Sequence, residues 1–253
     1  MTPEGWLTVA CVFGRTSGLL MGLPVFNTQG VPKHVTILMS VVLTLLIAPN
    51  LPVTPDEVTI VGSVFAIGSD LLLGWTLAMS VRIIFSAMAI AAEIISRQTA
   101  MGMAMFMDPV QQLQQSPIGV LASWISGLVF LSMGLHLKFL EGIAYSFYWI
   151  PPGQAGSVAP TAPILLEATK TAILVGFQLS GPLLVLVLLV NTFIGIMAKL
   201  APKMNMFFSI GMTLNTIMGI FVFALALPWM MVVHASHLEG TLDRFMQILT
   251  VVD

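Results

Sequence analysis

The sequence predicts an all-α membrane protein. Hydrophobic residues make up 57% of the 253 residues and charged residues only 8%, a balance that no water-soluble domain of this length could carry on its surface. Long apolar stretches alternate with short clusters of turn-forming residues, the pattern of helices that cross a bilayer and fold back as hairpins. We therefore expect one membrane domain over residues 1–253. The formal net charge of −2 provides no basic surface for nucleic acid, and we expect no nucleic-acid binding.

The apolar stretches set the expected helices. They lie at about 4–23, 35–49, 58–96, 118–150, 162–200 and 205–235. Because a spanning helix needs about 20 apolar residues, the second stretch is short for a full crossing, whereas the third and fifth are nearly twice the required length. We therefore expect each of the two longest helices to be broken or bent.

Glycine and proline indicate where the breaks should fall. In the fifth stretch the expected break is Gly181–Pro182, because proline removes a backbone donor and clashes with the preceding turn. The only weak points of the third stretch are its glycines, and the fourth is interrupted by small and polar residues. These positions are Gly62, Gly68 and Gly74 in the third stretch, and Gly127, Gly134, His136 and Lys138 in the fourth.

Stripes of small residues run along the first and last stretches. Residues four apart share one face of a helix, so such a stripe forms a groove in which another backbone can approach closely. The first stripe consists of Gly14, Gly18 and Gly22, and the second of Gly211, Asn215 and Gly219. The Asn215 amide could also hydrogen-bond across a helix interface. Packing within the chain and contact with other chains are both compatible with these stripes.

Arg15 lies within the first apolar stretch, and Asp70 and Arg82 lie within the third. A charge at bilayer depth costs several kcal/mol unless it is paired or hydrated, which favours a functional or assembly role. On one continuous helix, Asp70 and Arg82 would be about 120° and 18 Å apart. They cannot pair with each other, so each is expected to have a partner elsewhere.

Other charged residues are spaced for local pairing on a helix surface. The expected pairs are Glu93 with Arg97, Lys138 with Glu141, and Glu167 with Lys170. We expect these pairs to be structural.

The sequence contains no pattern that indicates catalysis. His234 and His237 are three residues apart, but no carboxylate or thiol pattern accompanies them, so we interpret them as solvated interfacial residues rather than metal ligands. The single cysteine, Cys11, lies in an apolar stretch and is expected to be a small buried residue. With no phosphate-binding loop, nucleophile motif or metal motif, we expect no enzyme, no metal and no cofactor.

The stretch MGMAMFMDPVQQLQQSP, residues 101–117, interrupts the apolar body of the chain. Alternating methionines have unbranched, adaptable side chains that can seal an irregular surface. Asp108–Pro109 ends any helix, because the residue before proline is pushed out of the α region. Such non-helical backbone cannot face lipid, so this loop must lie in water, in protein or along a water-filled cavity.

Three blocks of the sequence resemble the FliR/SctT family of type III export-gate proteins. They are FGRTSGLLMGLPVFNTQGVPK near the N-terminus, MGMAMFMDP with the later GLHLKFLEGIAYSFYWIPPG, and PLLVLVLLVNTFIGIMAKLAPKMNMFFSIGMTLNTIMGI, which holds Asn191 and Asn215. Their order and spacing fit the family from about residue 13 to 221. The resemblance is therefore fairly specific, although any one block would be weak.

The resemblance implies a multi-pass protein of the bacterial inner membrane within the flagellar basal body. One copy would assemble with FliP and FliQ into a closed cone of tilted, kinked helical hairpins, with FlhB around the cytoplasmic entrance and unfolded flagellar proteins passing through the centre. The loop at 101–117 would project into the lumen as a plug. The residues implied in that plug are Met101, Met103, Met105, Phe106, Met107, Asp108, Pro109, Gln111, Gln112, Gln114 and Gln115.

Alternative functions remain open at this point. The chain could serve a virulence-type export gate, or it could be a secondary transporter in which a broken helix at Gly181–Pro182 frames a midplane site with Asp70 and Arg82. A third interpretation treats the loop as an ordinary connection whose methionines face lipid. Only the export-gate hypothesis explains the composition of the loop.

Overall fold

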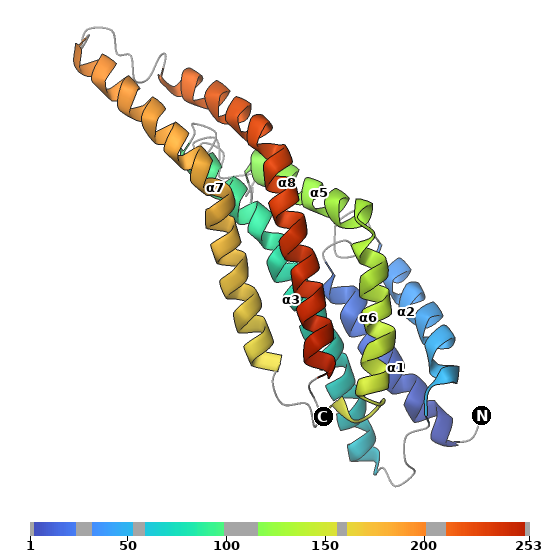
Figure 1. The fold of residues 1–253 in the computed structure, drawn as a ribbon. Coiled ribbons are helices and arrows are strands. Elements are labelled where there is room, and N and C mark those ends of the chain that lie inside the picture. The colour runs from blue at the N-terminus through green and yellow to red at the C-terminus, as the bar shows by residue number, and fades with distance from the viewer. Residues whose placement is uncertain are drawn as a thin grey trace. The chain divides into compact units, whose positions relative to one another are not determined.

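The fold is described from a computed structural model, which defines residues 3–23, 32–52, 59–98, 116–155, 161–200 and 211–250. No strand occurs in these ranges, and the all-α prediction is confirmed. The helices are α1 (Pro3–Gly22), α2 (Lys33–Ile47), the short 3-10 helix η1 (Ala48–Asn50), α3 (Ile60–Gln98), α5 (Pro117–Ser132), α6 (Leu135–Trp149), α7 (Thr161–Leu200) and α8 (Met212–Thr250) (Figure 1).

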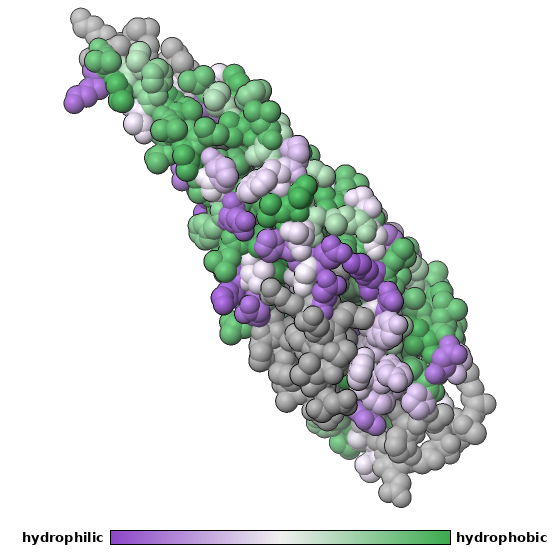
Figure 2. Space-filling view, viewed as in Figure 1, coloured by the Kyte–Doolittle hydropathy of each residue, from purple (hydrophilic) through white to green (hydrophobic). Residues whose placement is uncertain are grey.

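Several of these helices are suited to a membrane. Four are long and apolar enough to cross one: Lys33–Asn50, Ile60–Gln98, Leu165–Leu200 and Thr213–Thr241. The bent pair α5 and α6 supplies a fifth if it is counted as one broken span. Hydrophobic side chains cover much of the surface seen in Figure 2. The helix α1, which matches the first predicted stretch, is not among the candidate spans.

The two longest predicted helices were expected to be broken or bent; neither is broken, and α7 changes direction along its length (Figure 1). The helix α3 continues through Gly68 and Gly74, and α7 continues through Pro182. Proline and glycine are tolerated inside spanning helices, because neighbouring groups can satisfy the one backbone carbonyl that proline leaves free. A second internal proline, Pro228, lies within α8 in the same way.

The interruption expected in the fourth stretch is confirmed at one of its four positions. Gly134 has a φ of 68°, a left-handed conformation that favours glycine. It separates α5 from α6, and its carbonyl accepts the N–H of Leu137 at 2.9 Å. The interruption is therefore a single glycine, while His136 and Lys138 lie within α6.

The chain packs as two compact units. Unit 1 comprises Met1–Ile84, Phe130–Lys170 and Leu238–Asp253, and unit 2 comprises Phe85–Val129 and Thr171–His237. Unit 1 therefore contains α1, α2, the first part of α3 and α6. Unit 2 contains the last part of α3 and most of α5, α7 and α8.

Within unit 1, α2 lies beside α1 (Figure 1). Thr36, Ser40 and Thr44 are buried, and the Thr44 hydroxyl lies 3.1 Å from the Thr16 hydroxyl of α1. The outward residues are large and apolar, and Leu45 and Leu46 are more than 60% exposed. This distribution reverses that of a helix on a water-soluble protein and suits an apolar environment.

Candidate functional site

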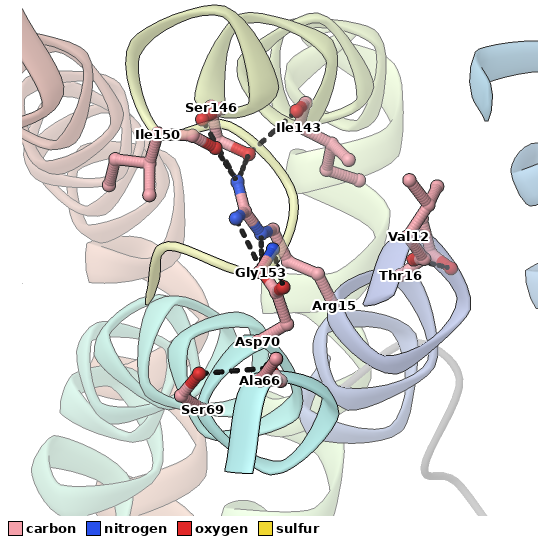
Figure 3. Close-up of polar contacts among 10 residues, drawn as sticks. All are labelled: Val12, Arg15, Thr16, Ala66, Ser69, Asp70, Ile143, Ser146, Ile150 and Gly153. Carbon is pink, nitrogen blue, oxygen red and sulfur yellow. Dashed lines mark hydrogen bonds and ion pairs between the residues drawn. The ribbon is translucent and has the colours of Figure 1, made fainter. Parts of the chain in front are cut away.

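A fully buried arginine on α1 is the centre of the most extensive polar network in the described part of unit 1. Arg15 donates from Nε to Asp70 Oδ1 on α3 at 2.7 Å, and its Nη2 forms an ion pair with the same oxygen. Its Nη1 donates to the carbonyl oxygens of Ser146 and Ile150 at the end of α6, each at 2.9 Å. Figure 3 shows the guanidinium between these two sets of acceptors. One side chain thus joins three helices.

The same network holds the turn that follows α6. Asp70 Oδ2 accepts the backbone N–H of Gly153 at 2.8 Å (Figure 3). Gly153 has a φ of 84°, where a side chain would be strained. The ring of Phe147 covers the arginine, with its centroid 4.3 Å from Cζ, a cation–π arrangement. Both carboxylate oxygens of Asp70 are therefore engaged.

This arrangement stabilises the packing of the helices and does not form a site for catalysis. A buried ion pair offsets its desolvation cost only when further hydrogen bonds satisfy the remaining donors and acceptors, and the two carbonyls and the Gly153 N–H provide those bonds. Neither Arg15 nor Asp70 has exposed surface on which to bind a substrate. The sequence predicted that Arg15 and Asp70 each have a partner. In the structure they pair with each other, although they are 55 residues apart in the sequence.

The third buried-charge candidate lies in different surroundings. Arg82 is on α3 but exposed, and within the described residues it makes no hydrogen bond or ion pair. The structure does not bring it to Asp70.

The first small-residue stripe faces α3. A Cβ added to Gly14 would lie 3.1 Å from the Ile67 carbonyl oxygen, and one added to Gly18 would overlap the Leu71 carbonyl oxygen. At Gly22 the added atom would meet the side chain of Ala78. The two backbones thus approach closely along this face.

The second stripe places Asn215 in a small polar cluster within unit 2. Its Nδ2 donates to Asn191 Oδ1 on α7 at 2.9 Å and to the Gln98 carbonyl oxygen, at the end of α3, at 3.3 Å. Gly211 and Gly219, one turn to either side, are buried. This cluster connects three helix segments without any net charge.

The expectation of solvated histidines is wrong for His234. Its side chain is completely buried, with Nε2 2.6 Å from the Ser126 hydroxyl on α5 and the Phe85 ring edge-on at 6.2 Å. The nitrogen Nδ1 of His237, in contrast, lies 2.8 Å from the Val233 carbonyl oxygen of its own helix. No group of three potential metal ligands occurs among the residues that the structure describes.

Of the expected local pairs, one is present. Lys170 and Glu167 lie 3.9 Å apart. Lys138 pairs with Glu239 of α8 instead of Glu141, because a residue distant in sequence lies within reach of its flexible side chain. Cys11 is buried, as expected.

The third expected pair is replaced by a contact with the backbone. The Glu93 carboxylate accepts the Ser116 N–H at 2.6 Å and forms no ion pair with Arg97 in the described structure. The candidate plug residues between Met101 and Gln115 lie outside the described residues.

Comparisons with known proteins support the resemblance found in the sequence. The model of the family described as bacterial export proteins, family 1, matches residues 6–241. The flagellar biosynthetic protein FliR of Pectobacterium carotovorum is 29% identical over 239 residues, covering 94% of this chain and 91% of that protein. The FliR of Escherichia coli K12 is 27% identical over 232 residues, covering 90% and 88%, and that of Caulobacter vibrioides is 25% identical over 238 residues, covering 93% and 94%.

The family match and the apolar helices both indicate where the protein lies in the cell. Four candidate spans and a match to bacterial export proteins over most of the chain make this a multi-pass protein of the bacterial inner membrane. The resemblance predicted from the sequence blocks is confirmed, and the chain belongs to family 1 of the bacterial export proteins.

Proposed function

We propose that this chain is a channel-forming subunit of the flagellar protein export gate. The observation that carries the proposal is the similarity to flagellar biosynthetic proteins named FliR, which extends over 90% or more of the chain in several of them. In this role it assembles with FliP and FliQ, contacts FlhB, and lets unfolded flagellar proteins cross the inner membrane. No catalytic step and no cofactor are needed for such a role.

The distribution of apolar surface supports a subunit enclosed by lipid and other helices. Large hydrophobic residues are exposed on α2, α3 and α7, including Leu46, Phe65 and Leu188, each more than 60% exposed. Such surfaces are stable only against lipid or protein.

We further propose that the Met-rich loop seals the closed gate. An export channel has to admit an unfolded chain yet retain ions when idle. Met103, Met105, Phe106 and Met107 supply flexible apolar side chains that can close around an irregular opening. Asp108–Pro109 sets the turn of the loop, and the glutamines at 111–115 contact the lumen.

Native mass spectrometry tests the proposed assembly. We expect the chain, purified from a membrane extract after coexpression with FliP and FliQ, to give by native mass spectrometry a complex that contains one copy of it together with several copies of each partner. Isolation of the chain alone, with substrate-dependent uptake after reconstitution, would instead identify a secondary transporter. That alternative finds little support in the site, because Asp70 is already saturated by Arg15 and Gly153.

The seal is tested by conductance. Removing residues 103–115 should raise the ion conductance of the assembled complex in a planar bilayer. Replacing Met103, Met105 and Met107 by serine should have the same effect without shortening the loop. A matched deletion of residues 156–160, another connection between helices, should leave conductance low. Unchanged conductance in a fully assembled loop variant would remove the sealing role.

A further inference from the structure

The part of α3 that belongs to unit 1 has a face directed away from the core. Six residues at alternating spacings of three and four lie on this face, which we call the α3 seam. Five of them are exposed and Met79 is half-buried; they are Phe65, Gly68, Leu72, Trp75, Met79 and Arg82. Phe65 and Leu72 are 75% and 60% exposed. Alternation of three and four is the spacing by which one helix packs along another.

Arg82 is the one charged member of the α3 seam. It is exposed and takes part in none of the ion pairs formed among the described residues. Its neighbours on the seam, Met79 and Trp75, lie about one and two turns before it and are apolar. The five N–H donors of a guanidinium find no acceptor among lipid acyl chains. Hydrocarbon alone therefore suits the rest of the seam but not this residue.

The contact between α1 and α3 shows how this protein satisfies a similar face. There Gly74 lies against the backbone of Arg15, and Asp70 pairs with the Arg15 side chain. Glycine allows the backbones to approach, and the opposite charges compensate each other. The α3 seam has the same two components. A Cβ added to Gly68 would meet nothing within 4 Å, and the Arg82 charge has no counterpart in the described part of the unit.

We propose that the α3 seam binds a membrane helix of a partner subunit, and that this helix is apolar apart from one carboxylate that pairs with Arg82. A carboxylate matches the two-pronged geometry of a guanidinium. The distance along α3 from Phe65 to Arg82 is about 26 Å, so the carboxylate lies at one end of a long apolar contact. The inference rests on the proposed function, because a partner helix is expected only if the chain is a subunit of an assembly.

Removing the Arg82 charge should weaken the complex and leave the chain itself unchanged. At a detergent concentration at which half of the parent complex with FliP and FliQ stays intact, we expect Arg82→Gln to lower the intact fraction roughly fivefold or more in native mass spectrometry. Arg82→Lys keeps the charge and should recover part of the loss. The melting temperature of the isolated chain should be the same for all three. Lys170→Gln is the matched control, because it removes an exposed cation that already lies near Glu167.

A crosslink identifies what covers the α3 seam. With benzoylphenylalanine in place of Leu72, irradiation of the complex should give an adduct with a membrane helix that contains an aspartate or glutamate. Combining Arg82→Glu with a lysine in place of that carboxylate should restore the intact fraction. An adduct with phospholipid alone overturns the inference, and so does an Arg82→Gln complex as stable as the parent. In both cases copurification with FliP and FliQ leaves the proposed function standing.

The opposite outcome is also distinguishable. If the chain does not copurify with FliP and FliQ, the proposed function fails. The same crosslink in native membranes then tests the α3 seam by itself. An adduct with an acidic helix of another membrane protein, confirmed by the exchange of charges, would still support the inference.

Discussion

The buried polar contacts of the two units differ in charge. In unit 1 a charged pair, Arg15 with Asp70, is completely buried and surrounded by acceptors and donors from α6 and the following turn. In unit 2 the polar contacts within the described helices are mostly neutral, as in Asn215 with Asn191 and His234 with Ser126. A buried charge has to be matched completely, whereas a neutral amide requires only one or two partners.

This difference predicts how each unit responds to substitution. Removing one member of the charged network should lower stability strongly, because the remaining charge is left buried and unpaired. Removing one neutral contact should lower stability only slightly and leave the other contacts in place. The expected effects below decrease in that order.

The largest effect should follow Asp70→Asn. Asparagine keeps the shape of the side chain but leaves the Arg15 charge uncompensated, which typically destabilises by about 3–5 kcal/mol. We expect this loss in the free energy of unfolding, measured by denaturation in mixed micelles. The double variant Arg15→Met with Asp70→Leu should recover part of it, because it removes both charges. Full stability of Asp70→Asn alone would show that the pair contributes little.

The next largest effect should follow Gly74→Ala, which adds a side chain where the backbones of α1 and α3 approach closely. A Cβ at Gly74 would overlap the Arg15 carbonyl oxygen, so Gly74→Ala has to push the two helices apart and displace Arg15. Overpacking of this kind costs about 1–3 kcal/mol. Gly68→Ala is the matched control on the same helix, because a Cβ at Gly68 meets nothing within 4 Å. Equal melting temperatures for the two variants would contradict the close approach.

Sequence patterns predict the helices better than the contacts between them. Apolar stretches and turn-forming clusters placed the other long helices within a few residues, whereas α8 continues to Thr250, fifteen residues past the expected end at 235. Gly134 was correctly expected to interrupt the fourth stretch. The third and fifth stretches were expected to be broken or bent, and both are unbroken helices, although α7 changes direction along its length (Figure 1). Local propensity overstates the cost of proline and glycine where the environment is apolar.

The networks depend on helix register, which local patterns do not encode. The sequence shows Arg15 and Asp70 as isolated buried charges, and their opposite signs were the one available clue to pairing. Their contact depends on how α1 lies against α3. The same limit applies to His234, whose partner Ser126 is 108 residues away, and to Glu93, which bonds a backbone N–H instead of the arginine four residues on.

A smaller effect is expected for the asparagine cluster of unit 2. Polar contacts between membrane helices average about 0.6 kcal/mol in double-mutant cycles. Asn191→Leu removes one hydrogen bond, whereas Asn215→Leu also removes the bond to the Gln98 carbonyl. We therefore expect Asn215→Leu to lower the free energy of unfolding more than Asn191→Leu. Strict additivity of the two changes would show that the amides do not interact.

The smallest effect should follow disruption of the ion pair between Lys138 and Glu239. Both side chains are more than 40% exposed, so solvent and salt screen their attraction, and ordering two long side chains opposes it. We expect Lys138→Gln to change the melting temperature less than Asn191→Leu, and any change to vanish in high salt. Exchanging the two charges, with Lys138→Glu and Glu239→Lys, should leave stability unchanged. A loss as large as that of Asp70→Asn would mean that this pair is shielded from water, and the contrast between buried and exposed charge pairs in unit 1 would then fail.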